Sequence, residues 1–494
     1  MTSNTKIGLG ICGAAIVLGV LGDALLRSTP WGLNVLLWIG ALTLIGLALI
    51  RWQRLRLTGG GRWLIIPALV FAAAFAWRDS ITLQFWNLTA LLIALALVAF
   101  RSQVGQVRIA GLTDYARALV MAGVQTALGV LALIFGDIHW KQVAPNRSSG
   151  RLIAISSGVL IAVPLLFIFG SLFVAADAAF EKIVHDLFNW NMNDLIVHSI
   201  WIGFWGWTTA GFLRQMLLTK EPAALPMTAP ALGIIEIGTA LGALNGLFLI
   251  FVLVQFRYLF GGEELIRSTT GLTYAEYARR GFFELVTVAA LVLPTLLGAH
   301  HLLRRENRSA QQAFRVLAGT LIALLFVIMF SALMRMRLYQ IEFGLTELRL
   351  YTTVFMGWLA IVFVWFALTV LRDQRNRFAF GALMAGFVVL IGLNALNPDN
   401  FIVRVNAGRT EAANPFDASY VAGLSADAVP ALIDSLPGLS DQDRCTTAAR
   451  ILRRWSPPAN FDWLTWNWNR IQAWQAVSAN QVYLQQIACP LQRD

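Results

Sequence analysis

The sequence predicts an all-α fold, a polytopic bundle of transmembrane helices with a small helical domain at its C-terminal end. Two observations support this prediction. Of the 494 residues, 57% are hydrophobic and only 13% are charged, whereas soluble chains contain about 25% charged residues. Apolar runs of about 20 residues, the length that crosses a hydrocarbon layer of about 30 Å as a helix, recur along most of the chain.

Eleven such runs are predicted to cross the membrane: residues 7–26, 31–50, 63–77, 81–100, 152–174, 195–218, 232–260, 282–303, 314–334, 350–371 and 378–396. The first run is long and lacks a small-x-small cleavage site, so we expect an uncleaved first span. A further run, 119–135, has basic residues on both sides. We expect it to lie as a re-entrant or interfacial helix on the cytoplasmic side.

The basic residues predict the orientation of the bundle. Arginines gather in short loops at 51–62, 304–308 and 372–377, and such loops stay in the cytoplasm. The N-terminus is then cytoplasmic and the C-terminus extracytoplasmic. Because the net charge of +11 is spread over these loops and forms no compact basic domain, nucleic acid is not an expected partner.

Changes in composition divide the chain into four predicted parts. They are an N-terminal four-span bundle (1–100), a cytoplasmic basic segment with the interfacial helix (101–151), a seven-span core (152–396) and an extracytoplasmic helical domain (397–494). Cys445 and Cys489 both fall in the last part, which should face an oxidising compartment. They are therefore candidates for a disulfide, with two buried free thiols as the alternative.

Five stretches carry a family resemblance: VQFRYLFGG from Val254, GLTYAEYARRGFFEL from Gly271, MRLYQIEFGLTELRLYT from Met336, LNPDNFIVRVN from Leu396 and YVAGLSADAVPAL from Tyr420. In their residues and in their order along the chain they resemble a family of polytopic bacterial membrane proteins, the domain of unknown function 4153/4173 group, over about residues 152–436. The resemblance implies a location in the bacterial cytoplasmic (inner) membrane. It implies no reaction and no catalytic residues.

Polar residues near the predicted outer surface form the candidate binding site. Two outer loops rich in arginine and tyrosine could surround an anionic head group or solute; the alternative is that they anchor the chain among lipid head groups. An asparagine in the middle of a span needs a polar partner, either a neighbouring helix or a ligand. The candidates are Asn245, Gln255, Arg257, Tyr277, Arg279, Arg280, Glu284, Arg335, Arg337, Tyr339 and Arg349.

A weaker pattern could bind a metal. Asp177, Glu181 and His185 are spaced four residues apart on a predicted helix and could chelate a divalent ion. A solvated helix face is the alternative. The sequence contains no phosphate-binding loop and no nucleophile elbow, and we predict no cofactor.

These features favour a transport-like or sensing bundle that recognises a lipid head group or an anionic solute at the outer face. A membrane enzyme acting on lipid-linked or envelope substrates is the first alternative, and a sensor or scaffold for another membrane protein is the second. Membrane lipids are the expected partners, with an envelope or membrane protein as a possible further one.

Overall fold

The computed structural model describes residues 1–54, 63–99, 111–143, 192–219, 232–260, 282–303, 308–409 and 417–490, with single positions between 158 and 180. Within these ranges the chain is helical, without strands apart from a lone bridge between Leu232 and Leu303. The predicted all-α fold is therefore confirmed. Nine helices in the described part are long and apolar enough to cross a membrane, which fits a multi-pass membrane protein.

Eight of these nine helices coincide with predicted spans: α1 (Ser3–Leu26), α2 (Leu33–Trp52), α4 (Ile81–Ala99), α10 (Ile234–Phe260), α13 (Phe282–Leu302), α14 (Arg308–Phe343), α15 (Glu347–Thr369) and α16 (Phe378–Leu396). Two further predicted spans form α3 (Ile65–Trp77), a shorter apolar helix, and α9 (Met192–Leu217). The predicted span 152–174 lies outside the described residues except at isolated positions.

The ninth long helix is α5 (Leu112–Ala132), which continues into the π-helical turn η3 (Leu133–Asp137). We predicted a re-entrant or interfacial helix within this region. The continuous helix is long enough to cross the membrane and packs on α9, where Arg214 pairs with Asp137 at 2.5 Å. The count of eleven spans and the interfacial placement stay predictions.

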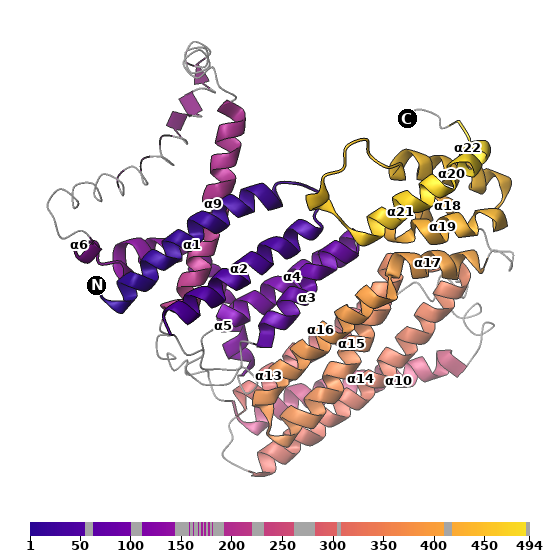
Figure 1. Ribbon diagram of the computed structural model, residues 1–494. Helices are drawn as coiled ribbons and strands as arrows, with labels where there is room; N and C mark the ends of the chain where they lie inside the picture. Colours follow the sequence, from indigo (N-terminus) through magenta and orange to yellow (C-terminus); the bar gives the residue numbers. More distant parts are fainter. Residues whose placement is uncertain are drawn as a thin grey trace.

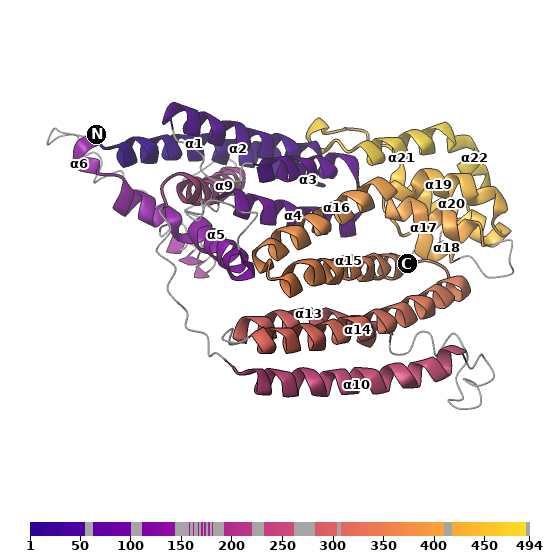
Figure 2. The ribbon, with the colours of Figure 1, turned by 90° about the horizontal axis from the view of Figure 1, so that it is seen from below.

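The long helices form two hydrophobic cores, and Figure 1 shows how the helices that build them are arranged. The first core unites helices α1 to α5 and α9, and the second unites α10, α13, α14 and α15. Helix α16 contributes to both, because Phe387 contacts Phe71 of α3 and Phe378 contacts Phe366 of α15. Seen from below, α4, α16, α15, α14 and α10 lie in successive rows (Figure 2). The four predicted domain boundaries stay predictions.

Short helices build a third core from the C-terminal part of the chain. They are α17 (Pro398–Ala407), α18 (Ala418–Val421), α19 (Val429–Ser435), α20 (Asp441–Trp455), α21 (Trp468–Ala479) and α22 (Gln481–Ile487). Cys445 and Cys489 form a disulfide with their Cα atoms 5.0 Å apart, as predicted. We call residues 397–409 and 417–490 the C-terminal unit. It lies at the end of the bundle away from the N-terminus (Figures 1 and 2).

Candidate functional site

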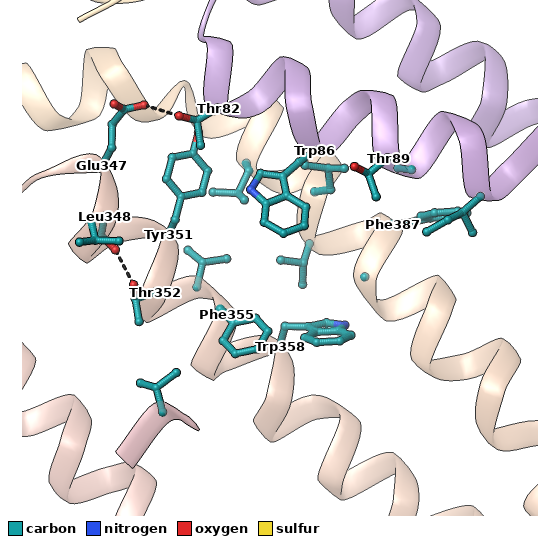
Figure 3. A pocket seen from close by; sticks show the side chains of 18 of the residues that line it. Thr82, Trp86, Thr89, Glu347, Leu348, Tyr351, Thr352, Phe355, Trp358 and Phe387 are labelled. Atoms are coloured by element: carbon teal, nitrogen blue, oxygen red, sulfur yellow. Dashed lines mark hydrogen bonds between the residues drawn. The ribbon is translucent and has the colours of Figure 1, made fainter. Parts of the chain in front are cut away.

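A cavity of about 1110 Å³ lies between α4, α13, α15 and α16, where the two halves of the bundle meet. We call it the seam groove. Its walls are mainly apolar, and the side chains of Trp86, Phe355, Trp358 and Phe387 lie around the same space (Figure 3). Leu348 at its rim is 62% exposed. The four helices that surround the groove are all long and apolar enough to span a membrane.

One end of the seam groove is polar because α15 begins there. Thr346 caps the helix by accepting a hydrogen bond from the Arg349 amide, which places Glu347 in the first turn. The positive end of the helix dipole favours a carboxylate at this position. Thr82 of α4 donates to Glu347 Oε1 at 3.0 Å, and the Glu347 amide donates to the Tyr420 hydroxyl at 2.7 Å (Figure 3 shows the former).

Asp399 lies behind this end because the chain turns sharply after α16. Asn397 adopts a left-handed conformation with φ of 56° that ends α16, and its side chain caps α17. The Ser425 amide and hydroxyl both donate to Asp399 Oδ2, at 3.2 and 2.5 Å. Burial raises the pKa of Asp399, and the bonds from Ser425 oppose that effect. Asp399 Oδ1 is buried and has no partner among the described residues.

Asp427 is a second buried carboxyl in the same region, and only 2% of its surface is exposed. Its Oδ1 accepts from the Asp79 amide at 2.9 Å and from the Asn469 side chain at 2.8 Å. Burial raises the pKa of Asp427 to about 7, although these hydrogen bonds act in the opposite direction. Asp427 thus ties the loop before α4 to the C-terminal unit.

The loop between α3 and α4 makes further polar contacts with the C-terminal unit and with α16. Asp79 forms a buried ion pair with Arg470 of α21. Arg78 donates to the Asn394 carbonyl at 2.6 Å, and Asn467 donates to the Arg78 carbonyl at 2.9 Å. The buried hydroxyls of Ser80 and Tyr351 lie near each other, and Tyr351 lines the seam groove. A polar joint between bundle and C-terminal unit therefore adjoins the groove.

The sequence did not predict this cluster as a site. Its residues come from three of the stretches that carry the family resemblance: Glu347 and Tyr351 from the stretch at 336–352, Asp399 from 396–406 and Asp427 from 420–432. The electrostatic influence of Asp399 on Glu347, Tyr351 and Asp427 shows that they lie near one another. The shared resemblance was the signal that could have grouped them.

Several predicted site residues lie elsewhere, between α10 and α14. Asn245 donates to the Leu317 carbonyl at 3.0 Å, the interhelical bond that was one of its two alternatives. Gln255 accepts from the Ser331 hydroxyl at 3.1 Å and from Arg335. These contacts join two helices that are separated from the seam groove by α13 and α15 (Figure 2).

Other predicted residues lie near the ends of α13, α14 and α15. Arg349 donates to the Phe343 carbonyl at 3.0 Å and stacks over Tyr339, 4.1 Å from the ring centre. Arg337 and Glu284 are exposed. Arg349 therefore closes the C-terminal end of α14.

The remaining predicted residues fall where placement is not described. Tyr277, Arg279 and Arg280 lie outside the described residues, as does the side chain of Arg257. Of the proposed metal face, Glu181 and His185 also lie outside, and Asp177 is described alone. Among the residues that are described, no group of three or more His, Cys, Asp or Glu side chains could hold a metal ion. The outer pocket and the metal face stay predictions.

A bundle of apolar helices with a groove between its halves is the architecture of a multi-pass integral membrane protein. The chain belongs to the DUF4153 family, a domain of unknown function whose family model matches residues 65–435. The match confirms the resemblance, starts much earlier than expected and includes Glu347, Asp399 and Asp427. Comparisons with curated proteins and with solved structures give no match.

Proposed function

We propose that the protein binds a membrane lipid, with an acyl chain in the seam groove and the head group at Glu347 and Tyr351. The carrying observation is a groove whose walls are apolar and whose one end is polar. Its volume of about 1110 Å³ exceeds the range of about 300–1,000 Å³ usual for small-molecule pockets. A long amphiphile suits this shape better than a compact solute.

The polar end should decide which lipid binds. An acyl chain gains little by moving from the bilayer into an apolar groove, because lipid tails are as apolar as the groove wall. Hydrogen bonds at the head group are different, since an unpaired polar group in a dry site costs about 1–3 kcal/mol. Selective binding of this kind is common to a transporter, a sensor and an enzyme acting on lipids.

We place the polar end at the outer surface of a bacterial inner membrane, with the N-terminus in the cytoplasm. This orientation is supported by the basic residues at the other end of the helices. Arg51 lies in the last turn of α2, and Arg372 follows α15. Arg315 of α14 forms an ion pair with Asp373, the residue after Arg372. Short loops rich in arginine are retained in the cytoplasm.

A groove-filling substitution tests the proposal. Gly386 lines the seam groove on α16, and a Cβ placed there would lie 3.4 Å from Trp358. Gly386→Phe should fill the groove and reduce retention of an added phospholipid at least tenfold, as measured by native mass spectrometry of the purified protein. Gly392→Phe on the same helix is the matched control, because Gly392 is exposed and has open space around it.

Two results would oppose lipid binding in the seam groove. The first is equal lipid retention by the parent and by Gly386→Phe. The second is equal loss of lipid in Gly386→Phe and Gly392→Phe, which would trace the effect to the helix as a whole. A circular dichroism spectrum and a melting curve for each variant establish that the fold is retained.

A further inference from the structure

Four carboxyl groups of the described residues lie at or behind the polar end of the seam groove, and three of them have an arginine partner or an arginine nearby. Asp79 pairs directly with Arg470. Asp427 and Asp399 also lie near positive charge, from Arg78 and Arg454 respectively.

Glu347 differs from these three carboxylates. It accepts a hydrogen bond from Thr82 and forms no ion pair within the described ranges. The guanidinium of nearby Arg349 bonds to the Phe343 and Gly344 carbonyls. Glu347 is therefore a carboxyl group that borders the groove and forms no ion pair in the described part.

Buried polar atoms also lie near Glu347. Asp399 is 1% exposed, and its Oδ1 has no hydrogen bond in the described part. The hydroxyl of Tyr351, which lines the seam groove, lies near the hydroxyl of Ser80, and both hydroxyl oxygens are buried. Asp399 acts electrostatically on both Glu347 and Tyr351, so the three groups lie near one another. Two acceptor carboxylates there call for a ligand that donates hydrogen bonds.

We infer that the bound lipid carries a protonated primary amine in its head group. This inference rests on the proposed function and specifies its ligand. The ammonium donates to the free oxygen of Glu347 and to the Tyr351 hydroxyl, and the Oδ1 of Asp399 behind them, unpartnered in the described part, is a further acceptor. An anionic head group without an amine would meet the unpaired carboxylate, and a trimethylammonium has no N–H to donate.

The experiment compares three phospholipids with identical acyl chains: phosphatidylethanolamine, phosphatidylcholine and phosphatidylglycerol. Each is titrated into the delipidated full-length protein, and binding is measured by native mass spectrometry. We expect the ethanolamine lipid to bind about tenfold more tightly than the other two, the factor expected for one charge-assisted hydrogen bond. Soluble phosphoethanolamine should fail to compete at equal concentration. If phosphoethanolamine competes equally, the site binds a soluble amine, and the inference that the amine belongs to a lipid is wrong.

Substitutions test whether Glu347 and Asp399 cause the preference for the ethanolamine lipid. Glu347→Gln keeps the shape and removes the charge, so it should reduce the tenfold preference to less than twofold. Glu342→Gln is the matched control, because Glu342 is exposed nearby and does not line the groove. Asp399→Asn, which can still accept from Ser425, should weaken the preference in the same direction and provides a second test if Glu347→Gln does not fold.

The outcomes separate the two proposals. If none of the three lipids binds, lipid binding itself fails and the amine inference fails with it. If all three bind equally, or if both variants retain the preference of the parent, the amine inference fails while the proposed function stands. Loss of the preference in Glu342→Gln as well would place the effect outside the seam groove and also overturn the inference.

Discussion

The buried carboxyl of Asp427 should make the protein less stable as the pH rises from about 4 to about 7. In the folded chain burial raises its pKa to about 7, against an ordinary value of 3.8. Between these values the folded state holds a proton that the unfolded state has released, so rising pH favours unfolding. A shift of about 3 units at about 1.36 kcal/mol per unit corresponds to a loss of about 4 kcal/mol.

Asp427→Asn removes this titration and retains an oxygen that can accept from the Asp79 amide. The free energy of unfolding is measured by denaturant titration in detergent at several pH values between 4 and 8. The stability of the parent relative to Asp427→Asn should fall across this window and level off above pH 7. Asp434→Asn, an exposed position on α19, controls for the loss of a carboxylate and should follow the parent.

Parallel curves for the parent and Asp427→Asn over the whole window would refute this reasoning. They would mean that Asp427 has the same proton affinity in both states. A relative stability that rises with pH would refute it more strongly, because it would require the folded state to favour the charged carboxylate. Asp399, whose pKa is also raised by burial, acts in the same direction and remains present in both proteins.

Two further predictions concern covalent and steric features of the fold. Replacing Cys445 and Cys489 by alanine should lower the free energy of unfolding by about 2–4 kcal/mol, because their disulfide closes a long loop; equal denaturation midpoints under non-reducing conditions would contradict this. Gly211→Ala should lower the melting temperature, since a Cβ there would lie 2.4 Å from the Thr126 carbonyl oxygen of α5. Gly242→Ala, with open space around it, should melt like the parent, and equal melting of both variants would refute the steric reasoning.

Most of the helices could be predicted because a membrane fixes the length and polarity of a span. Eight predicted spans reappear as long apolar helices. For α5, basic residues on both sides predicted a helix that does not cross, whereas its length and apolar composition are those of a candidate span. Basic residues in a loop indicate the side of the membrane on which that loop lies. The packing of α5 on α9 depends instead on residues far away in the sequence.

The polar joint could not be predicted in the same way. Asp79, Asp399 and Asp427 each stand beside a helix end, where isolated polar residues are usual. Their meeting depends on the order in which the helices pack, and periodicity does not reveal that order. Arg349, a candidate binding residue from the sequence, also hydrogen-bonds the last carbonyl of α14, a contact that its residue type does not reveal. Charge and residue type identify candidates, but the partners follow from the fold.

The bonds between the loop before α4 and α21 set a condition on the synthesis of the protein. Arg470 and Asp79 are 391 residues apart, so Asp79 is translated long before its counterion. Until α21 arrives, the joint has a carboxylate without its guanidinium, and an incomplete buried pair costs about 3–5 kcal/mol. A chain interrupted after residue 435 would retain every residue matched by the family and still be unable to close this joint. The contacts of the loop before α4 with α21 can therefore form only after α21 has been synthesised.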